Sequence, residues 1–426
     1  MARVRFISQT LATFCRTMVG SGGRLSAAAP ARERSLPPTS SGVRDAQGPH
    51  EARKAPAKVT TIQDTPYFTP AQCERLQARA RGHHTSAAKW DQMRMAACSF
   101  IAAVGAKLGC PQRTIGAAQM LYLRFHLFYP PADFSMHEVA CACVFTATKL
   151  NDTQKRVYDV VLASYALRFP DLLVPPPGAA SGACGDWIAH ATVPEMDIDV
   201  DAIQQEQARL VALERLLLQC ICFHFQPRSP LILRWTIKVA RYWQIPKQDA
   251  DLVWRTACDS HRTYAPLLYP PSTVACGCVY ATAAMMCVQD GTTRLADLFV
   301  EPRTWLSAWS TSMEAIQDVA LHLLHLYGMH APSLTMDQRS DRAVPLHVTY
   351  PPPMSLLAWA ACSPTETLGA RVTQAQIWIR QQPMAPGTRE QHVRVARNDD
   401  ALPSTMYSAH PDDGGRSVAT RYILLS

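Results

Sequence analysis

A chain of 426 residues, 48% of them hydrophobic, can bury the cores of two domains, so a single small module does not account for it. The formal net charge is +8, but residues 1–58 hold ten Lys and Arg against three Asp and Glu, which leaves a net charge of only +1 for the rest. The remainder is therefore close to neutral, which argues against direct, specific nucleic acid binding.

The 14 cysteines are scattered through apolar segments, and no Cys-x-x-Cys pair occurs. Zinc ribbons and thioredoxin-type redox sites use such pairs, so neither is indicated. The commonest spacing is Cys-x-Cys, which points two side chains of a helix to different faces and does not suit chelation. We therefore expect buried structural cysteines in a reducing compartment, with no metal and no cofactor. The three pairs are Cys141 and Cys143, Cys220 and Cys222, and Cys276 and Cys278.

The N-terminal segment has two competing interpretations. Residues 1–31 contain four Arg and no acidic residue, a composition that resembles a mitochondrial transit peptide. The alternative is a disordered basic tail or a misplaced start codon. Residues 20–58 are rich in Ser, Gly, Pro, Ala and Arg and cannot bury enough apolar surface to fold, so we predict a disordered basic tail over residues 1–86. No run of 18 uncharged apolar residues occurs, and we expect no membrane partner.

Helical periodicity begins near Ala87 and predicts a first set of five helices. Ser135, followed three residues later by Glu138, is typical of a capping box, and Pro111 suits a first helical turn. Residues 170–199 are rich in Pro, Gly and Ala and predict an exposed loop inserted before the fifth helix. The five predicted helices cover residues 87–108, 111–128, 135–150, 153–169 and 201–222.

A second set follows, and Gly328 stands at a plausible C-cap of its last helix. Beyond residue 328 the pattern is weak, although alternation over residues 375–380 and 420–425 predicts a few strands. The second set covers residues 230–243, 247–264, 272–288, a short piece near Leu295, and 312–327.

The two sets contain an internal repeat. Val-Ala-Cys-Ala-Cys-Val-Phe at residues 139–145 matches Val-Ala-Cys-Gly-Cys-Val-Tyr at residues 274–280, and each copy follows a Tyr-Pro-Pro, at Tyr129 and Tyr269. Both copies lie in helices that are apolar on every side, a pattern typical of a helix surrounded by others. The sequence therefore predicts an all-α fold of two tandem five-helix repeats, each built around a buried central helix.

Two charged residues lie in otherwise apolar helices. Lys149 is the only charged residue in 139–150, and Glu214 lies beside Arg215 in the apolar stretch 210–223. A charge held against a core needs a partner or access to water. The structural interpretation is that Lys149 complements the dipole at its helix end and reaches solvent, while Glu214 lies at a solvated edge.

Common enzyme signatures are absent from the sequence. It contains no Gly-x-Gly-x-x-Gly, no Gly-x-x-x-x-Gly-Lys phosphate loop, no His-Glu-x-x-His and no Gly-x-Ser-x-Gly. His83 and His84 lie in a polar segment without a nearby acidic residue, which favours a surface position. We expect a non-catalytic protein.

Taken together, these residues resemble the transcriptional cyclins, the group of cyclins T, K and L, and within it the beta subunits of fungal kinases that act on the C-terminal domain of RNA polymerase II. The resemblance covers about residues 87–328. It is carried by residues 114–125, which end in Tyr-Leu-Arg-Phe, by Ala-Cys-Ala-Cys-Val-Phe-Thr-Ala-Thr-Lys at 140–149, by Asp-Thr-Gln-Lys-Arg at 152–156, by 214–223, and by Tyr-Pro-Pro-Ser-Thr-Val-Ala at 269–275.

The resemblance implies a regulatory subunit that binds and activates a cyclin-dependent serine/threonine kinase, has no catalytic residues of its own, and works in the nucleus. In that family a lysine and a glutamate face each other and contact the kinase, and they correspond to Lys149 and Glu214. In the family the lysine is usually followed by an apolar residue and then by two acidic residues. Here Leu150 is followed by Asn151 and Asp152, so one acidic charge is missing. The implied kinase-binding residues are Lys149, Glu214, Phe145, Asp152, Leu217 and Phe223.

The resemblance also sets the expected domains. We place a first cyclin box at residues 87–225, a second at 226–328, and a C-terminal extension at 329–426. The competing hypothesis is a cyclin-fold basal transcription factor or adaptor without a kinase partner, which would need a zinc ribbon and a basic face that the sequence lacks. A mitochondrial enzyme is suggested only by residues 1–31.

Overall fold

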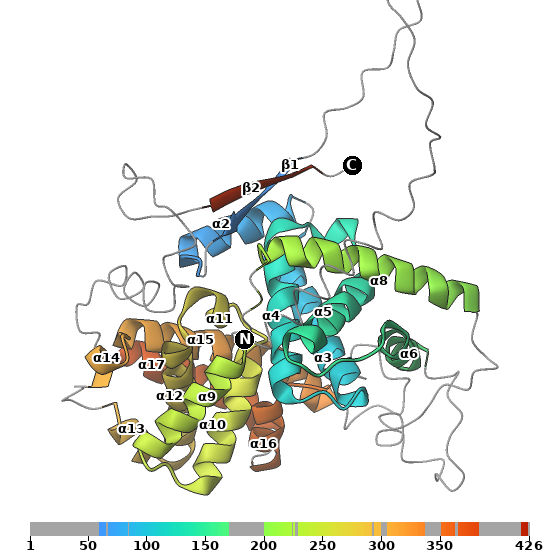
Figure 1. The fold of residues 1–426 in the computed structure, drawn as a ribbon. Helices are drawn as coiled ribbons and strands as arrows, with labels where there is room; N and C mark the ends of the chain where they lie inside the picture. The colour runs from blue at the N-terminus through green and yellow to red at the C-terminus, as the bar shows by residue number, and fades with distance from the viewer. Residues whose placement is uncertain are drawn as a thin grey trace, which may run out of the picture. The chain divides into compact units, whose positions relative to one another are not determined.

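The computed structural model describes residues 59–64, 67–83, 85–169, 200–223, 225, 229–291, 294–299, 305–336, 351–362, 365–382 and 419–424 (Figure 1). The predicted insertion at 170–199, the segment at 1–31 that resembles a transit peptide, and the tail up to residue 58 lie outside these residues.

The first predicted repeat is present as five helices. The central helix, α5, packs against each of the other four, and residues 139–145 within it are buried (Figure 1). A helix enclosed in this way has no solvent face, which explains why its sequence is apolar on every side. The helices are α3 (Ala87–Lys107), α4 (Gln112–Phe128), α5 (Met136–Leu150), α6 (Val157–Arg168) and α8 (Val200–Cys220).

The starts of these helices differ in detail from the prediction. Ser135 is the N-cap of α5, but its side chain makes no capping hydrogen bond, and Glu138 forms an ion pair with Arg209 of α8 at 3.0 Å instead. The capping box is therefore absent, because the glutamate has a tertiary partner. Pro111 is the N-cap of α4 and precedes its first turn. Helix α6 begins at Val157, four residues later than predicted.

The second repeat is built around α12, which packs against α9, α10 and α15. The sequence predicted no stretch that could span a membrane, whereas residues 271–288 are long and apolar enough to do so; 89% of that window is buried in the protein, as expected for a core helix. The helices are α9 (Ser229–Tyr242), α10 (Lys247–Ser260), α11 (Ala265–Leu268), α12 (Pro271–Asp290), α13 (Arg294–Asp297), α14 (Trp305–Ala308) and α15 (Met313–Met336). The predicted helix 247–264 therefore ends four residues early, at Ser260, and the short helix α11 begins just after the predicted range. The short piece near Leu295 is α13, and a second short helix, α14, follows it.

The two copies of the repeated motif differ at one central position, where helix packing requires a glycine in the second copy. Ala142 of α5 corresponds to Gly277 of α12. A Cβ placed on Gly277 would lie 2.4 Å from Val319 Cγ1 of α15, which no real pair of carbon atoms tolerates. The glycine therefore lets α12 and α15 approach more closely than a side chain would permit.

The segment before Ala87 is partly folded, which corrects the predicted tail. Strand β1 covers Val59–Asp64 and helix α2 covers Pro70–Arg81, while Tyr67 and Phe68 are buried between them. Thr69 and Gln72 form a complete capping box at the start of α2, with Pro70 in the first turn. This Thr-Pro-x-Gln signal was visible in the sequence and would have identified the helix.

The region after residue 328 is more helical than predicted. Helix α15 continues through Gly328 to Met336, and α16 (Met354–Cys362) and α17 (Thr365–Gln381) follow, with α17 packed on α12 and α15. The strand predicted at 375–380 is therefore wrong. The buried residues follow a helical spacing, which is shared by Leu368, Val372, Ala375 and Ile379.

The strand predicted at 420–425 is present as β2 (Ala419–Leu424), which pairs antiparallel with β1 and aligns Val59 with Leu424. Apart from these two strands and the 3-10 turn η1 (Pro131–Asp133), the elements of the described residues are α-helices. The predicted all-α fold is confirmed.

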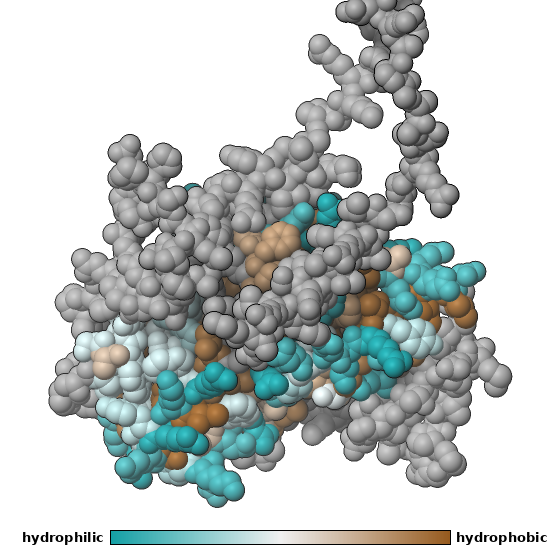
Figure 2. Space-filling model, viewed as in Figure 1, coloured by the Kyte–Doolittle hydropathy of each residue, from teal (hydrophilic) through white to brown (hydrophobic). Residues whose placement is uncertain are grey.

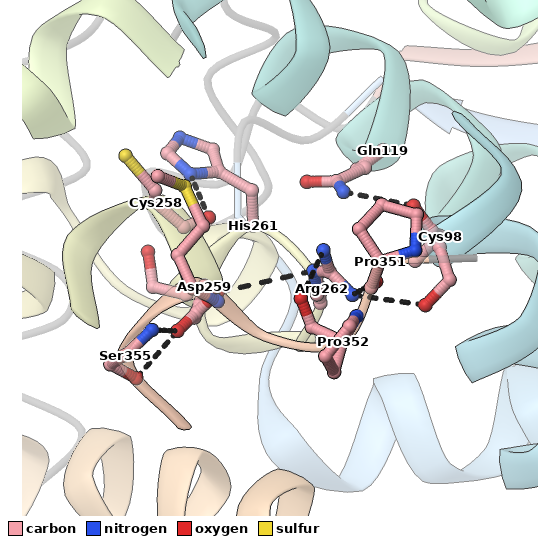
Figure 3. Close-up of polar contacts among 12 residues, drawn as sticks. Cys98, Gln119, Cys258, Asp259, His261, Arg262, Pro351, Pro352 and Ser355 are labelled. Atoms are coloured by element: carbon pink, nitrogen blue, oxygen red, sulfur yellow. Dashed lines mark hydrogen bonds and ion pairs between the residues drawn. The ribbon is translucent and has the colours of Figure 1, made fainter. Parts of the chain in front are cut away.

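A buried polar cluster joins the two repeats and the C-terminal extension (Figure 3). Arg262, after α10, donates to Ser99 Oγ of α3 at 3.0 Å and to the carbonyl oxygens of Pro351 and Pro352 at 3.2 and 3.3 Å. Arg94 of α3 donates in turn to the carbonyl oxygen of Arg262. These contacts link segments that lie 89 to 168 residues apart in the chain, and they fix the junction between the repeats.

The same cluster anchors α16. Asp259 is buried and accepts hydrogen bonds from the backbone N–H groups of Met354 and Ser355, at 2.7 and 2.8 Å, and from Ser355 Oγ at 2.6 Å (Figure 3). A carboxylate at the start of a helix satisfies N–H groups that have no partner within the helix and complements the helix dipole. Asp259 therefore caps α16 from the second repeat.

Candidate functional site

Lys149 and Glu214 meet where the end of α5 lies against α8. Lys149 Nζ donates to both oxygens of the Glu214 carboxylate, at 2.9 and 3.0 Å. The carboxylate is almost fully enclosed, with 9% of its side chain exposed, whereas 39% of the lysine side chain is exposed. Glu214 is therefore not the solvated residue of the structural interpretation, and the pair presents its positive member to solvent.

Phe145 and Leu217 each lie one helical turn from a member of this pair, Phe145 from Lys149 and Leu217 from Glu214. Lys149 Nζ lies over the ring of Phe145, 4.1 Å from its centroid, in a cation–π contact one helical turn along α5. Leu217 is completely buried, one turn beyond Glu214 on α8. In the free protein Leu217 therefore belongs to the core and packs α8 onto the repeat beside Glu214, and its contact with a partner stays a prediction.

The turn after α5 explains the departure from the family pattern. The buried side-chain amide of Asn151 donates to the carbonyl oxygen of Ala147 at 3.0 Å, and this carbonyl also accepts the Asn151 backbone N–H at 3.1 Å, so Asn151 holds the last turn of the helix with two hydrogen bonds. A carboxylate could not donate the side-chain hydrogen bond. Asp152 follows with φ 55°, in the left-handed region, and its side chain is exposed. The missing acidic charge is thus replaced by a helix cap.

Phe223 lies in the turn just after the C-terminal end of α8. Cys222 and Phe223 both have positive φ, 51° and 59°, and Phe223 N–H donates to the carbonyl oxygen of Leu218 at 3.0 Å. Phe223 is 42% exposed, and its ring centroid is 6.4 Å from that of Phe225. An exposed aromatic side chain on a fixed turn is suited to contact with another protein.

Arg124 was not singled out by the sequence, although it belongs to the Tyr-Leu-Arg-Phe motif. Its guanidinium group donates from Nε to the carbonyl oxygen of Cys220 at 2.9 Å, at the end of α8, and lies 5.1 and 5.7 Å from the ring centroids of Phe68 and Phe128. It therefore ties α8 to α4 and to the segment before α2. Cys220 and Phe68 are distant from Arg124 in the chain, so no local signal identifies this role.

The cysteines have the environment of core residues. Eleven free cysteines of the described part are buried. Burial raises the pKa of Cys98 and of Cys141 to about 11, so both are neutral thiols and poor nucleophiles at neutral pH. Within the described ranges, no group of three or more His, Cys, Asp or Glu is placed to hold a metal ion.

A doubled helical repeat with a lysine–glutamate pair at the edge of its first central helix is the arrangement that the resemblance to cyclins implied. Several proteins of similar sequence are cyclins or cyclin subunits. The chain is 30% identical to the CTD kinase subunit beta of Schizosaccharomyces pombe over 49% of its own length and 55% of the relative's. It is 25% identical to cyclin pch1 of the same organism, over 57% of this chain and 64% of that protein. It is 24% identical to human cyclin-L2, over 57% and 42% of the two lengths.

These relatives confirm the resemblance to the transcriptional cyclins that the motifs indicated. The chain spans about half of the length of the curated relatives it matches. No protein-family model matches it. A solved structure, described as the yeast RNA Pol II CTD kinase CTDK-1 complex, aligns over 78% of this chain and 88% of the matched chain, at 15% identity and a TM-score of 0.49.

Proposed function

We propose that this protein is a cyclin regulatory subunit that binds and activates a cyclin-dependent serine/threonine kinase, and that the kinase phosphorylates the C-terminal domain of RNA polymerase II. The similarity to a CTD kinase subunit beta and to several cyclins supports the class and this substrate. The observation that carries the kinase contact is the geometry of Lys149 and Glu214. Under this proposal the cyclin boxes cover residues 87–225 and 226–328, and the protein acts in the nucleus.

The pair suits the capture of a backbone segment of the kinase. An ammonium group has three N–H donors, and Glu214 orients that of Lys149 from one side only. A donor therefore stays available for a carbonyl oxygen of the partner. The ring of Phe145 contacts the lysine Nζ, and Asp152 and Phe223 supply exposed charge and apolar surface just after α5 and α8.

Activation follows from differential binding. The resemblance implies that this surface contacts the start of the kinase's mobile regulatory helix, whose glutamate pairs with the ATP-binding lysine when the helix is in place. A cyclin that binds the active position of that helix better than the inactive one shifts the population towards the active kinase. The cyclin itself contributes no catalytic residue.

The test is co-purification of the kinase with the tagged full chain and with two lysine variants. Lys149→Ala should reduce the recovered kinase at least tenfold, because the partner loses a charged donor at a desolvated contact. Lys89→Ala is the matched control, since Lys89 is an exposed lysine of α3 in the same repeat. Equal recovery with the wild type and Lys149→Ala would reject the assigned contact, and recovery of the folded chain without any kinase would favour an adaptor.

A further inference from the structure

The outer face of α9 carries three exposed cations. Arg234, Lys238 and Arg241 are spaced by four and three residues, so they lie on one face of the helix, and all three are exposed. No Asp or Glu occurs from Arg215 to Gln248, so α9 itself contributes no acidic residue. No ion pair of these three cations occurs within the described part of the chain, whereas Arg255 of α10 is paired with Asp251 at 2.9 Å.

Aromatic side chains border these cations. Tyr242 is 62% exposed, and its ring centroid lies 5.0 Å from that of Trp309. Trp235 is half-buried and packs edge-on against Trp309 at 6.3 Å, with Lys238 Nζ 4.7 Å from its ring centroid. Figure 2 shows hydrophilic and hydrophobic residues interleaved where Figure 1 places α9 and α10. We call Arg234, Lys238, Arg241, Trp235 and Tyr242 the basic α9 face.

Two properties of this face define its ligand. Two guanidinium groups and an ammonium group within two helical turns can converge on one phosphate group, which arginine binds in a bidentate manner. The neighbouring rings offer apolar area for the residues that flank the phosphate in an extended peptide. A serine or threonine phosphoester in a peptide therefore satisfies both the charge and the aromatic border.

We infer that the basic α9 face binds phosphorylated serine or threonine segments, the product of the proposed partner kinase. The inference rests on the proposed function for the origin of these segments. Binding at the second repeat would hold a substrate that already carries phosphate, while the kinase acts on a neighbouring site of the same chain. Retention of this kind raises the local concentration of the next site through a tether.

Nucleic acid fits the face less well. Strong binding to a phosphate backbone uses about six to ten phosphate contacts, whereas three cations are grouped here and the chain after residue 58 has a net charge of only +1. A membrane surface would require a broader basic area with a deeper apolar face. Both are outcomes that the experiment can recognise.

The experiment uses the full chain in complex with its co-purified kinase. Fluorescence anisotropy compares two ten-residue peptide libraries with random flanks, one with a fixed phosphoserine and one with serine, alongside a single-stranded oligouridylate and phosphatidylserine vesicles. The wild-type complex should bind the phosphoserine library at least tenfold more tightly than the serine library. The double substitution Arg234→Ala, Arg241→Ala should weaken that binding at least fivefold. The matched control is Arg75→Ala, Arg79→Ala, which removes two exposed arginines one turn apart on α2 and should change it less than twofold.

Equal affinity for the two libraries, or no effect of the α9 substitutions, would overturn the inference. Tighter binding of the oligonucleotide or of the vesicles than of the phosphoserine library, lost in the α9 variant, would also overturn it and assign the face to that ligand. A kinase that co-purifies while the libraries bind equally leaves the proposed function intact. A chain that captures no kinase fails the proposed function whatever the peptides do.

Discussion

Replacing either member of the Lys149–Glu214 pair should have unequal effects on the isolated protein. Lys149→Ala leaves the Glu214 carboxylate, 9% exposed, without its partner, whereas Glu214→Ala leaves a lysine that is already 39% exposed and can turn to water. The lysine also stays at the C-terminal end of α5, where the helix dipole favours a cation. The loss of the lysine should therefore destabilise the fold more than the loss of the glutamate.

The magnitudes follow from the exposure of the two side chains. Breaking a fully buried ion pair costs about 3 to 5 kcal/mol, and an exposed pair contributes about 0 to 1 kcal/mol. Because water reaches the lysine, we place Lys149→Ala between these limits, at about 1 to 3 kcal/mol of unfolding free energy. Glu214→Ala should cost about 1 kcal/mol or less.

Kinase binding, in contrast to stability, should be weakened by both substitutions alike. Both substitutions should raise the Kd at least tenfold, which corresponds to about 1.4 kcal/mol, because either one disrupts the oriented ammonium group. Urea unfolding of the isolated variants and titration against the purified kinase subunit measure the two effects. A larger loss of stability for Glu214→Ala than for Lys149→Ala would refute the burial argument, and Kd values within threefold of the wild type for both would refute the contact.

Three further predictions concern the fold. Gly277→Ala should cost about 1 to 3 kcal/mol and lower the Tm, because its Cβ would collide with Val319, and Val319→Ala in the same chain should recover part of the loss; an unchanged Tm would contradict this. Burial lowers the pKa of His126 from 6.5 to about 4, so stability should fall as the pH drops from about 6.5 towards 4, and His126→Gln should flatten the Tm–pH curve; parallel curves would contradict it. Asp259→Ala should accelerate hydrogen exchange across α16, because Asp259 accepts hydrogen bonds from the first N–H groups of that helix. Unchanged protection there would exclude the capping role.

Local patterns predicted most of the helical framework. The apolar motifs at 139–145 and 274–280 identified the two central helices because a surrounded helix must be apolar on all sides. The strand error at 375–380 arose because a short apolar run satisfies periods of 2 and of 3.6 alike, and only the longer window from Leu368 to Ile379 distinguishes them.

Long-range partners could not be predicted. Lys149 and Glu214 were identified through the resemblance, but their mutual distance and unequal exposure depend on how α5 packs against α8. Arg262 is an ordinary arginine in the sequence, and only the fold brings it to Ser99 and to the start of the C-terminal extension. Leu217 was expected at the kinase contact from the resemblance alone, and its complete burial in the free protein is a consequence of tertiary packing.

The central claim is that this chain activates a kinase, and reconstitution tests it most directly. The kinase subunit recovered with the tagged chain is purified alone, and phosphorylation of a peptide from the C-terminal domain of RNA polymerase II is measured with and without added full chain. We predict at least a tenfold increase in rate at saturating wild-type chain, and a markedly higher concentration for half-activation with Lys149→Ala. A folded chain that binds the kinase and leaves the rate unchanged would contradict the account.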